Sequence, residues 1–288
     1  MRAALISLAA AAARRLPLTT RLALYRLGPL TDLVREALNR AAPSGVRPVR
    51  VASGGLAGLW LLLDLQVDKD LWLGTYEPEL EQAIRRFASS GSVAYDLGAN
   101  VGYSTLLLAR AVGTAGHVFA FEPLTQNLDR LQGAIARNGL DAWITIVPSA
   151  VGAQSGAATF LIHPSGSMGR LTGGAGRREG FITSAEVDVV TLDDFVFASG
   201  HPAPAVVKVD LEGGEGGALQ GMRRLLKEHS PTLLIELHGA SAAAEVSREL
   251  DAAGYRMYLM QDGYPAMGTI EPAHPPKHVL ARRAEGGA

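Results

Sequence analysis

The chain has 288 residues, a formal net charge of −1 and no cysteine. This length can bury a substantial core, and the balanced charge provides no overall field toward phosphates, so we do not expect nucleic acid as a partner. The lack of cysteine excludes disulfides and thiolate metal sites. It also fits a reducing compartment, so we expect a cytoplasmic protein.

The first 75 residues are predicted to form an extension of helices and short strands. Leucines recur at near-helical spacing until Pro43-Ser44-Gly45 ends the pattern, and residues 49–67 indicate short strands. Residues 3–13 are apolar and are flanked by arginines. A helix packed on the domain explains this stretch best. A signal-like segment and peripheral membrane contact through residues 1–45 are the alternatives.

From residue 76 to residue 284 the pattern predicts one α/β domain, because helical and strand-like segments alternate regularly. Several strands, such as residues 233–235, are apolar on both faces, which indicates a mostly parallel sheet covered by helices on each side. A glycine-rich loop at 165–180 is interpreted either as a lid or as a segment without fixed structure. The predicted helices are 79–88, 102–112, 124–138, 215–228 and 241–253, and the predicted strands are 92–97, 117–122, 143–151, a hairpin across 157–162, 204–210, 231–237, 255–260 and 278–282.

The segment 93–102 predicts a nucleoside-binding strand–turn–helix unit. An apolar strand leads to Asp96, a tight turn follows at Gly98, and a helix begins near Gly102. The next predicted strand ends in Glu122, which could hold ribose hydroxyls. A dinucleotide fits poorly, because the third glycine of its motif is missing and Asp96 would repel a pyrophosphate. S-adenosylmethionine fits better, since it carries positive charge and a ribose but no phosphate.

Acidic residues follow four of the predicted strands, where parallel sheets bind their ligands. They are Asp96, Glu122, Asp210 with Glu212, and Glu236 with His238. Lys208 lies within a strand that is predicted to be buried on both faces, where an unpaired ammonium would cost several kcal/mol. We therefore expect Asp210 or Glu212 to pair with it.

Six short motifs follow one another along the chain, and their order is as informative as their residues. They are W-L-G-T-Y-E-P from Trp72, D-L-G-A-N-V-G-Y-S from Asp96, F-E-P-x-x-x-N from Phe121, T-L-D from Thr191, K-V-D-L-E-G-G-E from Lys208 and I-E-L-H from Ile235. Over residues 55–260 the chain resembles the FkbM-type methyltransferase family. This resemblance implies a class I, Rossmann-like fold that uses S-adenosylmethionine, and O-methylation of sugars, polyketides or other secondary metabolites.

The resemblance also implies roles for single residues. The methionine part of the cofactor would be framed by Asp96, Gly98, Asn100 and Gly102, and the ribose would be held by Glu122. Many enzymes of this fold have an acid near the end of the third strand for the adenine amine. This chain has Pro148-Ser149-Ala150 there, so backbone groups near Ala150 would bind the adenine.

Methyl transfer to an alcohol requires an aligned oxygen and a group that takes the hydroxyl proton. The candidates for catalysis are Asp210, Glu212, His238 and Lys208, and those for the acceptor side are Tyr76, Glu77, Glu215 and Glu236. A divalent cation on Asp210, Glu212 and Glu236 is an alternative way to activate the hydroxyl. The acceptor would be a hydroxyl of a small molecule or glycan, since the signature of amino-group methylases is absent.

Two other functions remain open at this point. One is a catalytically silent module that binds S-adenosylmethionine and a partner through the first 45 residues. The other is a nicotinamide-dependent oxidoreductase, which only the strand–turn–helix pattern supports.

Overall fold

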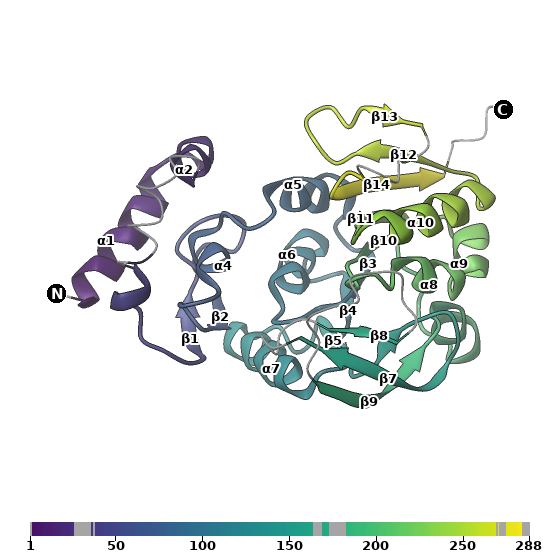
Figure 1. Cartoon of the computed structure of the whole chain (residues 1–288), viewed down its shortest axis with the longest axis horizontal. Coiled ribbons are helices and arrows are strands. Elements are labelled where there is room, and N and C mark those ends of the chain that lie inside the picture. Colours follow the sequence, from purple (N-terminus) through teal and green to yellow (C-terminus); the bar gives the residue numbers. More distant parts are fainter. Residues whose placement is uncertain are drawn as a thin grey trace.

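The computed structural model describes residues 2–25, 36, 38–163, 169–172, 183–268, 270 and 275–283. In this part of the chain an eight-stranded sheet has the order β13-β12-β14-β11-β10-β3-β4-β5 (Figure 1). Its strands are β3 (Val93–Leu97), β4 (His117–Phe121), β5 (Ile144–Val147), β10 (Val206–Val209), β11 (Thr232–Glu236), β12 (Tyr255–Leu259), β13 (Ala266–Met267) and β14 (His278–Arg283). The five strands from β11 to β5 in this order are parallel, and β14 runs antiparallel to both of its neighbours.

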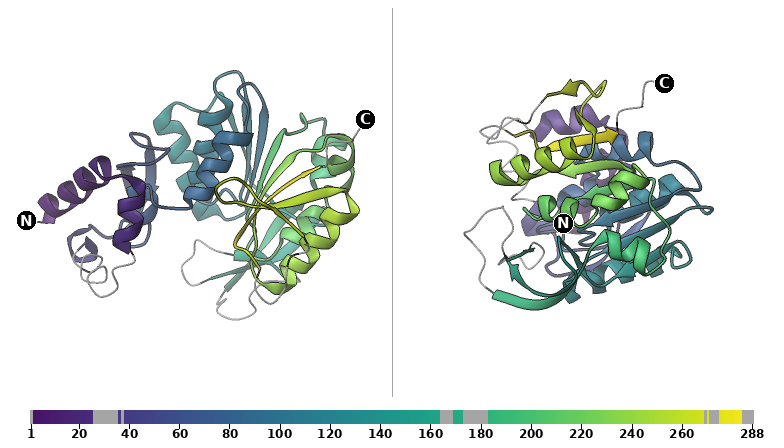
Figure 2. Two further views of the ribbon diagram at one scale, coloured as in Figure 1. Left: turned by 90° about the horizontal axis from the view of Figure 1, so that it is seen from above. Right: turned by 90° about the vertical axis from the view of Figure 1, so that its right-hand side faces the viewer.

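Helices cover both faces of this sheet (Figure 2), and alternate residues along each strand divide between two hydrophobic cores. Ala94 and Val206 face one core, which contains α5 (Pro78–Phe87), α6 (Tyr103–Val112) and α7 (Thr125–Asn138). Tyr95 and Val207 face the other core, against α8 (Glu215–Gln220), α9 (Arg223–Glu228), α10 (Ala240–Ala252) and η1 (Asp194–Ala198). The predicted α/β fold with helices on both faces is confirmed.

A second sheet has the order β6-β9-β7-β8 and lies beside the carboxyl end of β5. Its strands are β6 (Ala150–Val151), β7 (Gly156–Ile162), β8 (Gly169–Leu171) and β9 (Thr183–Val190). The predicted strand 143–151 is wrong as one element, because Pro148 interrupts it and its two halves join different sheets. The segment 157–162 is likewise not a hairpin but one strand, β7, between β8 and β9. Most of the glycine-rich loop lies outside the described residues, and its described part includes β8.

The predicted helix 215–228 is also two helices, α8 and α9, separated at Gly221. A Cβ atom at that glycine would lie 2.1 Å from the carbonyl oxygen of Gly152, so the chain passes too close to the second sheet for a side chain.

The N-terminal extension contains α1 (Arg2–Arg15), α2 (Leu18–Tyr25), β1 (Arg47–Arg50), β2 (Trp60–Leu63) and α4 (Lys69–Leu73). Leu61 and Leu63 of β2 are buried in the same core as α6, and Arg130 of α7 forms an ion pair with Asp68. Residues before the expected boundary at residue 75 therefore pack against the main domain. A separate domain 1–75 stays a prediction. Among the described residues, no helix combines the length and the apolar character that crossing a membrane requires. Membrane contact through residues 1–45 also stays a prediction.

Candidate active site

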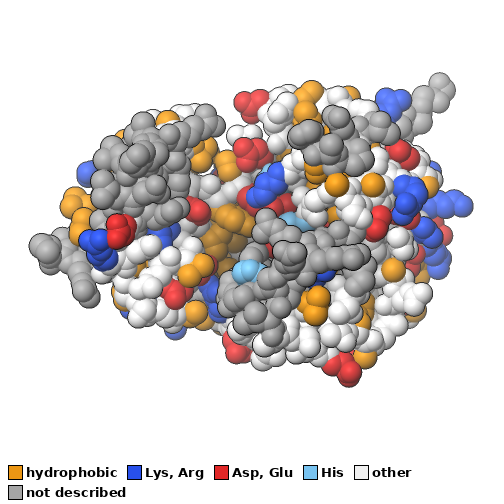
Figure 3. Space-filling model, viewed as in Figure 1, with side chains coloured by type: hydrophobic (Ala, Val, Ile, Leu, Met, Phe, Trp, Pro, Cys, Tyr) orange, Lys and Arg blue, Asp and Glu red, His pale blue; other side chains and the backbone are white. Residues whose placement is uncertain are grey.

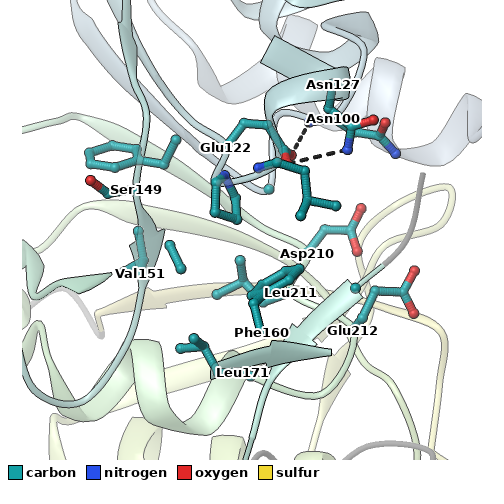
Figure 4. A pocket seen from close by; sticks show the side chains of 17 residues that line it. Asn100, Glu122, Asn127, Ser149, Val151, Phe160, Leu171, Asp210, Leu211 and Glu212 are labelled. Atoms are coloured by element: carbon teal, nitrogen blue, oxygen red, sulfur yellow. Dashed lines mark hydrogen bonds between the residues drawn. The ribbon is translucent and has the colours of Figure 1, made fainter. Parts of the chain in front are cut away.

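A pocket lies at the carboxyl ends of β3, β4 and β10, between the main sheet and the second sheet (Figure 4). It has about 610 Å³ of empty space, which includes open solvent at its mouth. Asn100, Asp210 and Glu212 lie on one side of it, and Ser149 and Val151 lie on the other. The lining residues are Gly98, Asn100, Phe121, Glu122, Pro123, Leu124, Asn127, Ser149, Ala150, Val151, Phe160, Gly169, Leu171, Asp210, Leu211, Glu212 and Gly214.

The backbone turn after β3 forms one wall of the pocket. Gly98 has φ +79°, and a Cβ atom there would lie 2.0 Å from the carbonyl oxygen of Asp210, so only glycine fits. Asn100 also has a positive φ, 49°, which asparagine tolerates better than most residues. Its Oδ1 atom is buried and has no hydrogen-bond partner among the described residues. An unpaired buried acceptor beside a pocket is suited to a ligand that donates a hydrogen bond.

Glu122 is held rigidly at the end of β4. Its Oε2 atom accepts a hydrogen bond from the Asn100 amide at 2.9 Å, and its Oε1 atom accepts bonds from the Leu124 amide at 2.9 Å and Asn127 Nδ2 at 3.2 Å (Figure 4). Burial raises the pKa of this carboxyl group, although these hydrogen bonds oppose the shift. The carboxylate still has lone pairs for a ligand, because each oxygen can accept more than one bond.

Asp96 does not line the pocket and is completely buried. It lies directly opposite Lys208 in the sheet, with its Oδ1 atom 3.2 Å from Lys208 Nζ. Its Oδ2 atom accepts hydrogen bonds from Ser104 Oγ at 2.9 Å and Thr105 Oγ1 at 2.6 Å. In this structure the carboxylate holds β3, β10 and α6 together, and its predicted place at the methionine part of the cofactor stays a prediction.

Lys208 is buried, as the sequence predicted, and its expected partner Asp210 lies 3.4 Å from its Nζ atom. Glu212, the other expected partner, forms no ion pair with it in the described part of the chain. The ammonium also donates a hydrogen bond to the carbonyl oxygen of Gly98 at 2.8 Å. Burial opposes the charge, but Asp96 and Asp210 outweigh it and raise the pKa of Lys208, so the lysine is charged.

Gly102 and Ala150 differ in their relation to the pocket. Gly102 is not among the lining residues. It caps the start of α6 with φ +94°, and a Cβ atom there would lie 2.7 Å from Leu131 Cδ1 of α7, so its place beside the cofactor stays a prediction. Ala150 does line the pocket, as predicted.

His238 follows β11 and lies within a group of four carboxylates. Its Nδ1 atom donates a hydrogen bond to Glu215 Oε1 at 2.8 Å. Its Nε2 atom lies 3.7 Å from Asp210, 3.6 Å from Glu212 and 3.5 Å from Glu236. Burial opposes a charge on the imidazole, but the Glu215 hydrogen bond and the neighbouring carboxylates raise the pKa of His238 to about 11.

The neighbouring acids titrate differently from one another. Burial raises the pKa of Asp210 to about 7 against the effect of Lys208, and burial also raises the pKa of Glu212. Burial favours a neutral Glu236 as well, but His238, His278 and Lys277 hold its pKa below the usual range.

A profile of the Methyltransferase FkbM domain matches residues 96–257, more than half of the chain. The chain belongs to the FkbM methyltransferase family. It is therefore an S-adenosylmethionine-dependent methyltransferase with a class I fold, and the order of its main sheet, with β14 antiparallel between β11 and β12, is that of the fold.

Individual relatives are more distant. The chain is 27% identical over 195 residues to hexuronic acid methyltransferase AglP of Haloferax volcanii, which covers 68% of this chain and 72% of that protein. The structure of methyltransferase FkbM from Methylobacillus flagellatus aligns with a TM-score of 0.44 at 19% identity, over 76% of this chain and 54% of that one, so the chain spans about half the length of that protein. An S-adenosylmethionine-dependent O-methyltransferase from Thermotoga maritima aligns with a TM-score of 0.44 at 14% identity, over 74% of this chain and 67% of that one.

The charged group around Glu77 and Glu236 contains two residues that the sequence did not indicate as site residues, Lys277 and His278. Lys277 Nζ lies 2.9 Å from Glu77 Oε1 and 3.1 Å from Glu236 Oε1. His278 Nε2 lies 3.5 Å from Glu77 and 3.6 Å from Glu236. Glu77 is thus buried in this charged group, while Tyr76 is partly exposed and contacts the ring of Tyr103. Their place on the acceptor side stays a prediction.

The surface is hollowed between the extension and the main sheet, and acidic, basic and histidine side chains gather around the hollow (Figure 3). Among the described residues, two groups have ligand atoms close enough to hold a metal ion: Asp210, Glu236 and His238, and Glu77, Glu236 and His278. The predicted trio differs from the first of these groups in having Glu212 where the structure places His238. The second sheet also lines the pocket through Val151, Phe160, Gly169 and Leu171, and no role was predicted for Phe160 from the sequence.

Proposed function

We propose that this enzyme transfers the methyl group of S-adenosylmethionine to a hydroxyl group of a sugar residue. The observation that carries the proposal is one pocket with Glu122 on the cofactor side and two further carboxylates, Asp210 and Glu212, beside it. A relative whose name gives a hexuronic acid as its substrate supports a sugar as the acceptor.

The cofactor is proposed to lie along the pocket from Asn100 to Ser149. Glu122 would accept hydrogen bonds from the ribose hydroxyls, and the unpaired Asn100 Oδ1 atom would accept one from the ammonium of the methionine part. The adenine would lie near Ala150 and Val151, among apolar side chains such as Phe160. This arrangement directs the sulfonium toward Asp210 and Glu212.

In the transfer step the acceptor oxygen forms a bond to the methyl carbon while the bond from carbon to sulfur breaks. The sulfur keeps the electron pair of that bond and leaves as a neutral thioether. The hydroxyl proton must pass to a base beside the oxygen. We assign this role to Glu212, because it lines the pocket and its side chain is 35% exposed, against 20% for Asp210, which also pairs with Lys208. His238 is disfavoured as the base, since its carboxylate neighbours keep it protonated.

The charge of the acceptor side favours a hydroxyl over a carboxylate as the reacting group. Asp210, Glu212 and Glu236 would repel an acceptor carboxylate placed at the methyl group, whereas a hydroxyl can donate a hydrogen bond to them.

Calorimetric titration with S-adenosylmethionine, its demethylated product and NAD tests the cofactor, and only the first two should bind. Transfer of labelled methyl to hexuronic acids and to matched neutral hexoses, as free sugars and as glycosides, tests the acceptor. The product should keep its label in mild alkali, because a methyl ether survives conditions that hydrolyse a methyl ester. Release of the label would refute a hydroxyl acceptor. Transfer by Glu212→Gln at the wild-type rate would refute the base.

A further inference from the structure

The imidazole of His238 is oriented in the way that metal ligands usually are. Glu215, which is completely buried, accepts the Nδ1 proton at 2.8 Å, and this carboxylate is itself held by the amides of Gly213 at 3.0 Å and Leu211 at 3.3 Å. A histidine that binds a metal commonly donates its other ring N–H to a carboxylate in this manner, which fixes the tautomer. Without a metal ion Nε2 carries the second proton of the charged imidazole, and a cation that binds there would displace this proton.

The atoms around Nε2 are spaced for a cation rather than for direct hydrogen bonds. Carboxylate oxygens of Glu236, Glu212 and Asp210 lie 3.5 to 3.7 Å from Nε2, which is beyond good hydrogen-bond length. Ligand atoms about 2.1 to 2.5 Å from one divalent ion are separated by about 3 to 4 Å. The ligand atoms of Asp210, Glu236 and His238 all lie within 4.8 Å of one another.

The neighbouring group of Glu77, Glu236 and His278 shares Glu236 with this site. The side chain of His278 is 90% buried, since its exposed fraction is 10%. Its Nε2 atom points at Glu77 and Glu236 and has no hydrogen-bond partner among the described residues. The group has six carboxylates against at most four positive charges: Glu77, Asp96, Asp210, Glu212, Glu215 and Glu236 against Lys208, Lys277, His238 and His278.

We propose that Asp210, Glu236 and His238 bind one divalent cation of the Mg²⁺ or Mn²⁺ type at the acceptor side of the pocket. The two carboxylates suit either ion, and the imidazole nitrogen favours Mn²⁺ over Mg²⁺ because Mg²⁺ takes oxygen ligands. Asp210 can serve through Oδ1, because Lys208 lies at its Oδ2 atom. Glu236 is the residue shared with the neighbouring group of Glu77 and His278.

The role of the ion rests on the proposed function. An ion between Asp210 and His238 would lie beside the reacting hydroxyl and lower its pKa, so that Glu212 needs to be only a weak base. It would also offset the excess of negative charge around the acceptor.

Binding of Mn²⁺ to the full-length, chelator-treated protein tests the site without any need for activity. The free Mn²⁺ signal in electron paramagnetic resonance, titrated with protein, should give one site per chain. His238→Asn should weaken its affinity at least tenfold, and His278→Asn should change it less than threefold. His229→Asn, in an exposed position, controls for the loss of a histidine. If His238→Asn does not fold, Glu236→Gln replaces it, with the same expected loss.

Three outcomes would overturn the proposal: no Mn²⁺ binding by the wild type, unchanged affinity in the folded His238→Asn or Glu236→Gln variant, or a loss in His278→Asn instead. The last result would place the ion in the neighbouring group. Calorimetric titration of every variant with the demethylated product of S-adenosylmethionine shows whether the cofactor pocket is intact. A wild type that binds Mn²⁺ but methylates no sugar would contradict the proposed function and leave the metal site standing.

Discussion

Replacement of Lys208 by methionine should destabilise the native state strongly. The ammonium is 3% exposed and lies 3.2 Å from Asp96, which is completely buried. At this separation the attraction is about 5 kcal/mol with an effective dielectric constant of 20, and desolvation offsets much of it. Loss of one partner leaves the other charge buried, so we expect the free energy of unfolding to fall by about 3 to 5 kcal/mol. That is a large share of the roughly 5 to 15 kcal/mol that holds most proteins folded.

Urea denaturation followed by circular dichroism measures this loss, and Lys227→Met provides the control, because Lys227 is exposed and should change stability by less than about 0.5 kcal/mol. The double variant Asp96→Asn with Lys208→Met removes both charges, so it should be more stable than the sum of the single losses implies. A loss below about 1 kcal/mol for Lys208→Met would refute the reasoning, and so would additive losses in the double variant.

Three further predictions concern the pocket and its charges. Glu122→Gln should weaken S-adenosylmethionine binding at least tenfold in calorimetry, since the variant loses the charged acceptor for the ribose; an unchanged affinity would contradict the proposed ribose contact. Gly98→Ala should lower the free energy of unfolding by more than about 3 kcal/mol, because its Cβ atom would lie 2.0 Å from a carbonyl oxygen. The control Gly139→Ala has no neighbour within 4 Å of its Cβ atom and should cost about 1 kcal/mol. Equal losses in the two variants would contradict the packing argument. In EDTA the free energy of unfolding of the wild type should fall relative to that of His238→Asn as the pH rises from 6.5 to 9, by at most about 1.4 kcal/mol per pH unit. The pKa of His238 is about 11 in the folded state and lower in the unfolded state, so the stability that its proton provides is lost as the pH rises through this range. A difference in urea titrations that stays constant with pH would contradict this.

The main sheet could be predicted well from the sequence, because the apolar runs of its strands and the acids that follow them are both local features of the chain. Strands such as β10 and β11 are buried on both faces, so they appear as short apolar runs. Acids at the ends of these runs then fall at one edge of a parallel sheet, and the structure brings Asp210, Glu212, Glu236 and His238 together there.

The depth at which an acid lies is harder to predict. Asp96 follows the same pattern as Glu122 and lies on the same face of the sheet, since it is opposite Ala120, two residues before Glu122. Asp96 lies within β3, where Lys208 of β10 is opposite it, whereas Glu122 follows the end of β4. The neighbouring hydroxyls of Ser104 and Thr105 gave a signal that could have indicated a buried carboxylate.

Two charged residues beside the pocket could not be predicted, because they belong to the antiparallel strand β14. Lys277 and His278 stand at the beginning of β14, whereas Asp210, Glu236 and His238 stand at or just after the ends of their strands. The beginning of an antiparallel strand lies at the same edge as the ends of its parallel neighbours. Without the direction of β14, the sequence could not place these two residues beside Glu236.

The buried Lys208 links the stability of the core to the chemistry of the site. Its ammonium contacts Asp96 in the core and Oδ2 of Asp210 at the pocket, while Oδ1 of Asp210 faces His238. A hydrophobic residue at position 208 would avoid the desolvation of a charge, but Asp210 would then have no fixed partner on that side. Under the proposed function, the need for an oriented carboxylate beside the acceptor explains why a strand that is otherwise apolar contains a lysine.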